Sequence, residues 1–359
     1  MSTSKRFFDL ICEVPFRFHS TSLAFLLCIA LLAQASGQVP ARRNAGGRPE
    51  HNEAERAARW KTVRMPYERT GLSTREQQMV AKLADACQLM DELFWHQSDL
   101  GGWAVYRVTQ SPVLAKLFGV MGSRWDLLDD NFPFLGEEPM PPGHELYPYG
   151  LNREQIDRFT ATHPEMKDAL FDEHTIVRGT ADHLSAIPYH EAYAEWLRPM
   201  AADLRAAAEL SPDPAFARYL RLRADALLSD DYYASDIAWL DLKNPKIDLI
   251  FAPYETYLDE LLGVKTSYGG AILICDQEQS RRLDLYQANE AAMQQALPLP
   301  DADKTSKQGQ ATPMEVVDSP LRAGDLRHGY QAVADNLPND ARIHAEKGTK
   351  KIFLVPFSA

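Results

Sequence analysis

Residues 230–274 read DDYYASDIAWLDLKNPKIDLIFAPYETYLDELLGVKTSYGGAILI, and the character of the chain changes within this stretch. Two apolar runs, 247–251 and 267–274, are bounded by Asn, Pro, Gly and Ser, which is the pattern of buried strands. A third run of this kind lies near the C-terminal end, at 350–355. The second half of the chain is therefore predicted to contain a small sheet.

The residues before this stretch have the three- and four-residue apolar spacing of helices. Ser73 and Glu76 form a capping-box pair at the start of the clearest helix, 73–97. Further helical patterns cover 152–173 and 189–229, with a break at 212–214. A helical region, 59–229, followed by a mixed region, 230–359, predicts an α+β fold whose sheet is small and mainly antiparallel, or a partial barrel.

The N-terminal end has the features of an export signal. Residues 22–35 are apolar and uncharged, Lys5, Arg6 and Arg17 precede them, and small residues follow. The run is shorter than the roughly 20 apolar residues that span a bilayer, so no stable membrane anchor is expected. We predict a signal peptide over 1–37, a flexible leader over 38–58, and an exported protein that is periplasmic or secreted.

The charge of the chain bears on its partners, and its cysteine content bears on disulfide bonding. The formal net charge is −12 and the isoelectric point is about 5.3, which argues against nucleic acid because binding phosphate needs a concentrated basic face. Beyond the predicted signal peptide only Cys87 and Cys275 remain. A disulfide between them and two buried free thiols are both compatible with the sequence.

The sequence contains no complete catalytic motif that would by itself predict an enzyme. His144-Glu145 and His190-Glu191 begin a helical zinc motif, but neither has a second histidine at the required spacing. A metal site built from the dispersed histidines is the weaker interpretation, and structural or surface roles are the stronger one for His163, His174, His183 and His190. No metal ligand is predicted.

Two short segments carry polar groups suited to binding a peptide. In APYETYLD, 252–259, alternation after a strand would let Glu255, Tyr257 and Asp259 project together. An ordinary polar strand end is the alternative. The segment NLPN supplies Asn336 and Asn339, whose amides can pair with a peptide backbone, or which can simply form a turn.

These segments resemble the dipeptidyl-peptidase III family of zinc exopeptidases, in particular its exported bacterial branch. The resemblance extends over about 60–353 and is strongest at 230–275 and 312–352. Glu255, Thr256, Tyr257 and Asp259 are similar to the family's Glu-Ser/Thr-Tyr-x-Asp signature, and 336–339 to its Asn-x-Pro-Asn element. The resemblance implies that Glu255 receives the free α-amino group of a peptide substrate, that Tyr257 is a catalytic residue supporting the reacting carbonyl, and that Asn336 and Asn339 hold the peptide backbone.

The family's zinc ligands lie C-terminal to the matched segments. The resemblance therefore implies a chain truncated before the zinc-binding motif, which binds no zinc itself and is inactive as it stands, so that enzyme activity is left open. Such a chain would expose surface that normally faces the other lobe, and self-association is a further expectation. The alternative hypothesis is a non-enzymatic exported peptide-binding protein.

Overall fold

The computed structural model describes residues 52–61, 71–301, 304, 313–329 and 332–354. The predicted signal peptide, 1–37, and most of the predicted leader lie outside these residues. The chain divides into two units between Arg56 and Ala57. Of the first unit, the described residues are 52–56, where helix α3 (Glu53–Ala58) begins. The second unit holds the sheet and the other helices.

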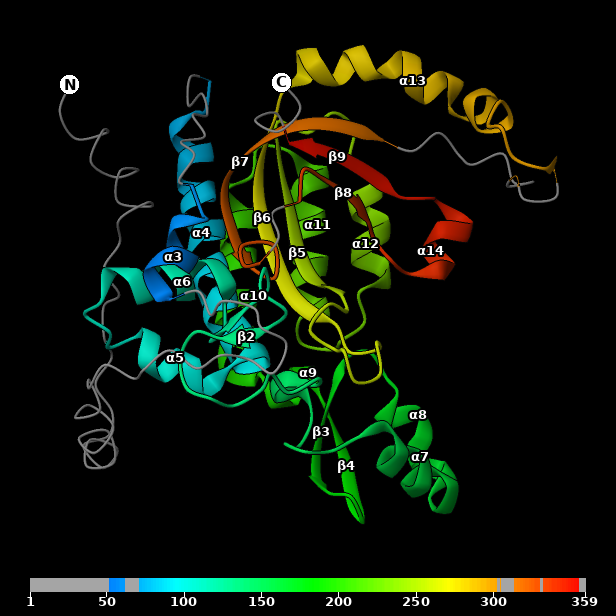
Figure 1. Cartoon of the computed structure of the whole chain (residues 1–359). Coiled ribbons are helices and arrows are strands. Elements are labelled where there is room, and N and C mark those ends of the chain that lie inside the picture. The colour runs from blue at the N-terminus through cyan, green and yellow to red at the C-terminus, as the bar shows by residue number, and fades with distance from the viewer. Residues whose placement is uncertain (1–51, 62–70, 302–303, 305–312, 330–331, 355–359) are drawn as a thin grey trace. The chain divides into compact units, whose positions relative to one another are not determined.

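A five-stranded sheet forms the centre of the second unit (Figure 1), with the strand order β5-β6-β7-β9-β8. All neighbouring strands are antiparallel except β7 and β9, which are parallel. The strands have the bounds β5 (Ile247–Glu255), β6 (Ser267–Cys275), β7 (Met314–Gly324), β8 (Ala334–Leu337) and β9 (Lys350–Leu354). The three strand predictions are confirmed, as is the α+β class.

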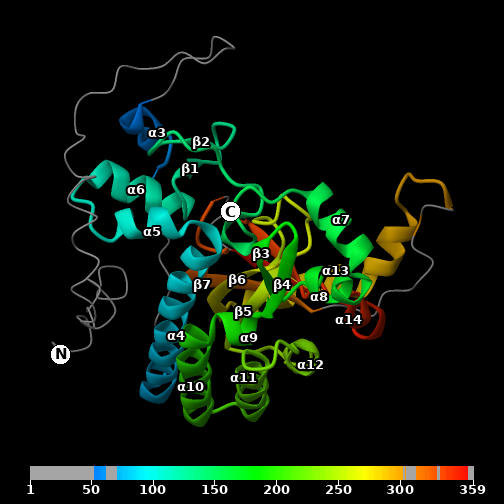
Figure 2. The same cartoon turned by 90° about the horizontal axis from the view of Figure 1, so that it is seen from below.

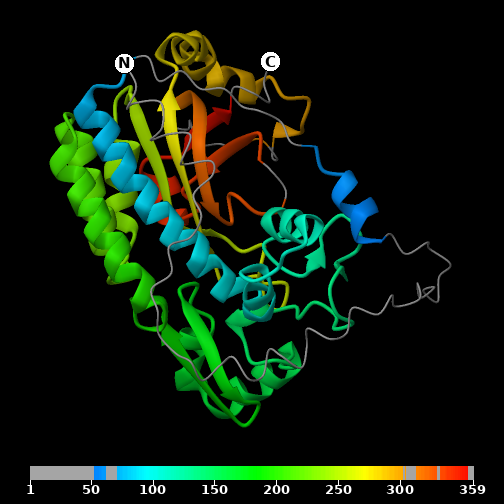
Figure 3. The same cartoon turned by 90° about the vertical axis from the view of Figure 1, so that its left-hand side faces the viewer.

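Four helices lie along one face of this sheet (Figures 1 and 2): α4 (Thr74–Ser98), α10 (Ala194–Leu210), α11 (Pro214–Ala226) and α12 (Tyr233–Leu240). Ser73 and Glu76 form the predicted capping box at the start of α4. The predicted break at 212–214 separates α10 from α11, which begins at Pro214 with Asp213 as its N-cap. Because α4 crosses β6 and β7 obliquely (Figure 3), its C-terminal end lies near the C-terminal end of β7. This crossing brings helix and strand residues to the same site.

The remaining elements are shorter or more peripheral. The predicted helical region also contains a hairpin of β3 (Thr175–Thr180) and β4 (His183–Pro188), with no counterpart among the predicted strands. The other helices are α5 (Leu100–Tyr106), α6 (Pro112–Met121), η1 (His144–Leu146), α7 (Arg153–Thr162), η2 (Pro164–Met166), α8 (Lys167–Leu170), α9 (Tyr189–Ala192), α13 (Gln277–Gln295) and α14 (Ala341–Glu346). A two-stranded ladder joins β1 (Trp125–Asp126) to β2 (Phe132–Pro133). None of the described helices is long and apolar enough to cross a membrane.

A buried charged cluster crosses the sheet. Lys350 of β9 lies with its ammonium nitrogen 2.7 Å from Asp248 Oδ2 of β5 and 3.2 Å from Glu315 Oε1 of β7. The indole Nε1 of Trp239 donates to Asp248 Oδ1 at 2.9 Å. Cys275 Sγ lies 3.8 Å from Glu315 Oε2. Both Cys275 and Cys87 are free thiols in the structure, so they do not pair with each other.

Candidate functional site

The segment 252–259 begins inside the sheet and leaves it at Glu255, the last residue of β5. A bulge between Pro253 and Glu255 shifts the register, so that Glu255 pairs with Ser267 of β6. Ser267 Oγ donates to the Glu255 carbonyl oxygen at 3.2 Å. This contact holds Glu255 at the edge of the sheet while the chain turns away, and Tyr257 in that turn is 74% exposed.

Asp259 does not project together with Glu255 and Tyr257, so the prediction from alternation is wrong at this position. Because β5 ends at Glu255, the two-residue period of a strand no longer applies beyond it. Asp259 is buried, and its Oδ2 accepts from the Tyr147 hydroxyl at 2.8 Å. Its two carboxylate oxygens also accept three backbone N–H groups, those of residues 262, 264 and 265, at 2.8–2.9 Å. Asp259 therefore organises the turn that carries Tyr257.

Asn336 and Asn339 come from the opposite edge of the sheet, at β8 and the loop that follows it. Asn336 Oδ1 accepts from Thr349 Oγ1 at 2.6 Å. Asn339 Nδ2 donates to the Tyr254 carbonyl oxygen at 3.0 Å. This second bond ties the loop after β8 to the end of β5. It brings the NLPN segment beside Glu255, although more than 80 residues separate them in sequence.

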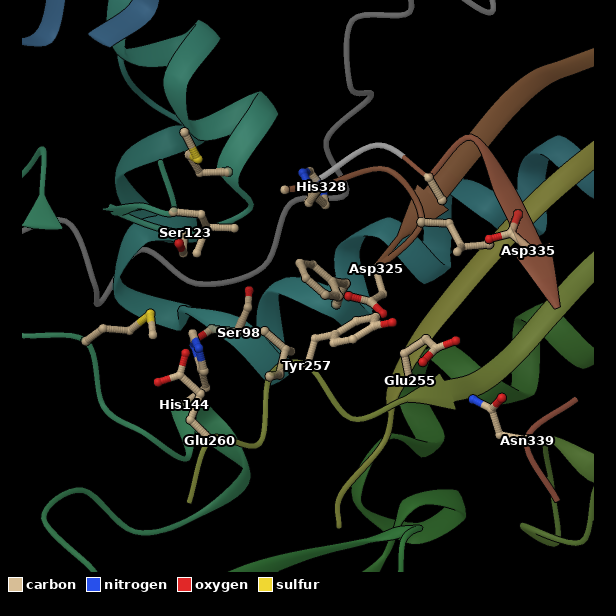
Figure 4. Close-up of a pocket in the computed structure, with 18 of the residues that line it drawn as sticks. Ser98, Ser123, His144, Glu255, Tyr257, Glu260, Asp325, His328, Asp335 and Asn339 are labelled. Atoms are coloured by element: carbon tan, nitrogen blue, oxygen red, sulfur yellow. The ribbon is translucent and has the colours of Figure 1, made fainter. Parts of the chain in front are cut away.

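All four predicted site residues line one pocket with a cavity volume of about 680 Å³ (Figure 4). Glu255, Asp335 and Asn339 lie on one side of it, whereas Ser123, His144 and Glu260 lie on the other, with Tyr257 and Asp325 between the two sides. Four of the described lining residues are acidic, and none of the described ones is Lys or Arg. The described lining is therefore rich in acidic groups, which are complementary in charge to a cationic ligand.

The carboxylates of the pocket raise the pKa values of one another and of the Tyr257 hydroxyl. The Glu255 carboxylate is the main cause of the raised pKa of the Tyr257 hydroxyl, and Asp325 and Asp335 act in the same direction. Burial raises the pKa of Asp325 to about 7, with the charge of Glu255 adding to the effect. Burial and Glu255 also raise the pKa of Asp335. Bringing a cation among these groups would relieve their repulsion.

Two buried histidines form part of the opposite wall. His144 Nδ1 lies 2.9 Å from the Ser98 carbonyl oxygen, so this nitrogen carries the hydrogen, and burial lowers the pKa of His144. His328 lies between two acceptors, the Gly119 carbonyl oxygen at 3.0 Å and Asp91 Oδ1 at 3.1 Å. Both ring nitrogens of His328 therefore have a hydrogen-bonding partner within the wall.

Among the described residues, no three His, Cys, Asp or Glu side chains are grouped so that they could hold a metal ion. The dispersed histidines have other contacts. His163 stacks on Phe159, with ring centroids 4.3 Å apart, and His190 Nδ1 lies 2.7 Å from Asp230 Oδ2. The residues in this part of the chain therefore do not fit a resident metal.

The fold matches that of solved structures, among them two dipeptidyl-peptidase III structures. The chain superimposes on DPP III from Caldithrix abyssi with a TM-score of 0.79 and 35% sequence identity. The match covers 84% of this chain and 59% of that protein. The fold is that of dipeptidyl-peptidase III. The enzyme from Corallococcus sp. strain EGB agrees, with a TM-score of 0.78 and 30% identity over 85% of this chain and 58% of that one. The resemblance to dipeptidyl-peptidase III is therefore confirmed at the level of the fold, and the chain spans less than two thirds of these proteins.

A curated relative is Nudix hydrolase 3 from Arabidopsis thaliana, with 29% identity in an alignment 355 positions long that covers 82% of this chain and 46% of the relative. No protein-family model matches the chain. Because less than half of the plant protein is covered, its name describes that protein and gives no activity to this one.

Sequence reasoning missed Asp325, Asp335 and His144 as pocket residues. Asp335 directly precedes Asn336, so its proximity to the NLPN segment was a usable signal. Asp325 follows β7, whose pairing with β6 brings it beside Glu255, and β7 was not among the predicted strands. His144 begins the short helix η1, whose placement depends on its contact with α4, which no local pattern indicates.

Proposed function

We propose that the chain carries the peptide-binding cleft of a dipeptidyl-peptidase III-type peptidase and binds the free N-terminus of a peptide. The observation that carries the proposal is the single pocket in which Glu255, Tyr257, Asn336 and Asn339 meet. An exopeptidase must recognise one charged end of its substrate, and a carboxylate facing an ammonium group is a strong, short contact. The absence of Lys and Arg from the described lining residues supports a cationic ligand.

The two asparagines offer complementary groups to a peptide backbone. Asn336 uses its Oδ1 to accept from Thr349, which leaves its Nδ2 as the donor for a peptide carbonyl. Asn339 uses its Nδ2 to donate to Tyr254, which leaves its Oδ1 as the acceptor for a peptide N–H. In the described part of the chain, no other contact occupies these two groups. One donor and one acceptor side by side suit an extended peptide.

Tyr257 is the residue that we assign to the reacting carbonyl. Its raised pKa keeps the hydroxyl protonated at neutral pH, so it can donate a hydrogen bond. A donor placed where negative charge develops accelerates acyl transfer by about 10²–10³-fold. Zinc, the metal of the family, would activate the attacking water, but the described residues do not fit it. The proposal therefore concerns peptide binding, and hydrolysis is proposed only for a protein that also supplies the metal site.

Export is proposed on the basis of residues 22–35, which lie outside the described part of the chain.

Calorimetric titration with tetra-alanine tests the proposed binding. The peptide with a free N-terminus is expected to bind at least about 10-fold more tightly than its N-acetylated form, because acetylation removes the charge that Glu255 and its neighbours attract. Equal binding of both peptides, or saturable binding of neither, would overturn the proposal. Zinc content and turnover of a dipeptidyl-arylamide, measured on the same sample, separate a peptidase from a binding protein.

A further inference from the structure

A tight turn at the end of β7 fixes Asp325 in the pocket. Gly324, the last residue of β7, has a φ of 57°, and a Cβ atom there would lie 2.2 Å from the Tyr268 carbonyl oxygen. The N–H of Gly324 donates to Asp91 Oδ1 of α4 at 3.1 Å. The N–H of Asp325 donates to the Tyr268 carbonyl oxygen of β6 at 3.0 Å. The turn that carries Asp325 is therefore held by both α4 and β6.

The side chain of Asp325 faces the same part of the pocket as Glu255. Asp325 is only partly buried, and it lies between the two sides of the pocket, next to Tyr257 (Figure 4). The Ser267 hydroxyl contacts both the Glu255 carbonyl oxygen, at 3.2 Å, and the Asp325 carboxyl group. Two carboxyl groups, one at the end of β5 and one after β7, thus meet at the proposed position of the peptide amine.

The cationic side chains that follow Asp325 in its turn are directed at another carboxylate. Arg327 Nη1 lies 2.8 Å from Asp91 Oδ2. His328 Nε2 lies 3.1 Å from Asp91 Oδ1. Asp91 of α4, and not Asp325, is therefore the partner of both.

The two aspartates of the pocket differ in what surrounds them. Burial raises the pKa of Asp335, and the positive charge of Arg322 on β7 opposes this effect. Burial raises the pKa of Asp325 to about 7, the Ser267 hydroxyl lowers it, and the charge of Glu255 raises it further. None of these influences on Asp325 is a cation, so a bound ammonium group would supply the charge that favours its ionised form.

A peptide amine needs more than one acceptor. An ammonium group has three N–H donors and accepts nothing, and each bond to a carboxylate is strengthened by the opposite charges. We infer that Asp325 binds the peptide amine together with Glu255, and that the arriving ammonium displaces a proton from Asp325 to the solvent. The inference rests on the proposed function and adds to it a second carboxyl group, which lies outside both motifs of the family resemblance.

Calorimetric titration of tetra-alanine in phosphate and in imidazole, both at pH 7, measures the displaced proton. A group with a pKa of about 7 is half protonated in the free protein and ionised in the complex, so about 0.5 proton leaves it. The peptide amine takes up about 0.1 proton, which leaves a net release of about 0.4 per peptide. The heat of binding should therefore differ between the two buffers. Equal heats would overturn the inference.

Two variants identify the group that releases the proton. Asp325→Asn keeps the shape of the side chain and should abolish the release, and at pH 8 it should weaken tetra-alanine binding by about 10-fold. Asp325→Glu keeps a carboxyl group and should keep the release. Release that persists in Asp325→Asn would assign the proton to another group and contradict the inference. Thermal unfolding verifies that each variant is folded, and the comparison of buffers on the wild-type chain needs no variant.

The affinity should also depend on pH. Because the amine binds the ionised form of Asp325, tetra-alanine should bind wild type about 3- to 8-fold more tightly at pH 7.5 than at pH 6, whereas Asp325→Asn should change by less than about 2-fold. If the peptide with a free amine binds better than its N-acetylated form but neither proton release nor this pH dependence occurs, the inference is wrong and the proposed function stands. If both peptides bind equally, the proposed function itself fails.

Discussion

Replacing Lys350 by methionine is expected to lower the free energy of unfolding by about 3–5 kcal/mol at pH 8, because it leaves buried carboxylates without their cation. The side chains of Lys350 and Asp248 are fully buried, and that of Glu315 is 7% exposed. The ammonium of Lys350 is the group that balances both carboxylates in the centre of the sheet. Urea unfolding followed by circular dichroism measures the loss.

The destabilisation by Lys350→Met should be smaller at pH 5 than at pH 8. Burial, with the charge of Asp248 adding to it, raises the pKa of Glu315 to about 7, from an ordinary value of 4.5. An acid whose pKa is raised by folding favours the folded state below its unfolded pKa, and this contribution is lost as the pH rises through the folded pKa. Without Lys350 the pKa of Glu315 rises further, so more stability is lost between pH 5 and 8.

The double variant Lys350→Met with Glu315→Gln is the matched control for this prediction. It removes the titrating carboxylate, so its unfolding free energy should recover at pH 8 and change less with pH than that of Lys350→Met alone. A loss by Lys350→Met of less than about 1 kcal/mol, or an equal loss at pH 5 and pH 8, would contradict the assigned role of the cluster.

Replacing Asp259 by asparagine is expected to cost about 2–4 kcal/mol of unfolding free energy, since an amide cannot accept at both positions and its NH₂ would face buried donors. The carboxylate accepts from Tyr147 and from three backbone N–H groups. The exposed neighbour Glu260 makes a suitable control, because Glu260→Gln should change stability by less than about 0.5 kcal/mol. Equal effects of the two substitutions would show that Asp259 does not organise the turn.

The sequence predicted those parts of the fold that depend on local patterns. The strands at 247–255 and 267–275 were visible because their apolar runs are long and bounded by turn residues. The capping box at Ser73 and the helix start at Pro214 depend on side chains only a few residues apart. The hairpin 175–188 escaped prediction because its residues mix exposed and buried positions without a clear period.

Of the site residues, only those that belong to a short sequence motif could be predicted. Glu255, Tyr257, Asn336 and Asn339 stand in recognisable segments, and the structure brings all four to one pocket. Asp259 belongs to the same motif, yet the end of β5 turns its side chain into the protein. Lys265 shows a second limit of local reasoning. Nothing in the local sequence distinguishes this residue from a surface lysine. It is nevertheless fully buried, and its ammonium group donates to the carbonyl oxygens of Leu170 and Asp172 at 2.8 and 2.6 Å.

The most direct test of peptide recognition is calorimetric titration of tetra-alanine into the wild-type chain and the Glu255→Gln variant. Loss of a charge-assisted contact with the α-amino group should weaken binding by about 30- to 150-fold. Binding of the N-acetylated peptide, which has no charge to lose, should be the same for both proteins. Equal affinity of wild type and Glu255→Gln for the peptide with a free N-terminus would contradict the account that Glu255 binds the peptide amine.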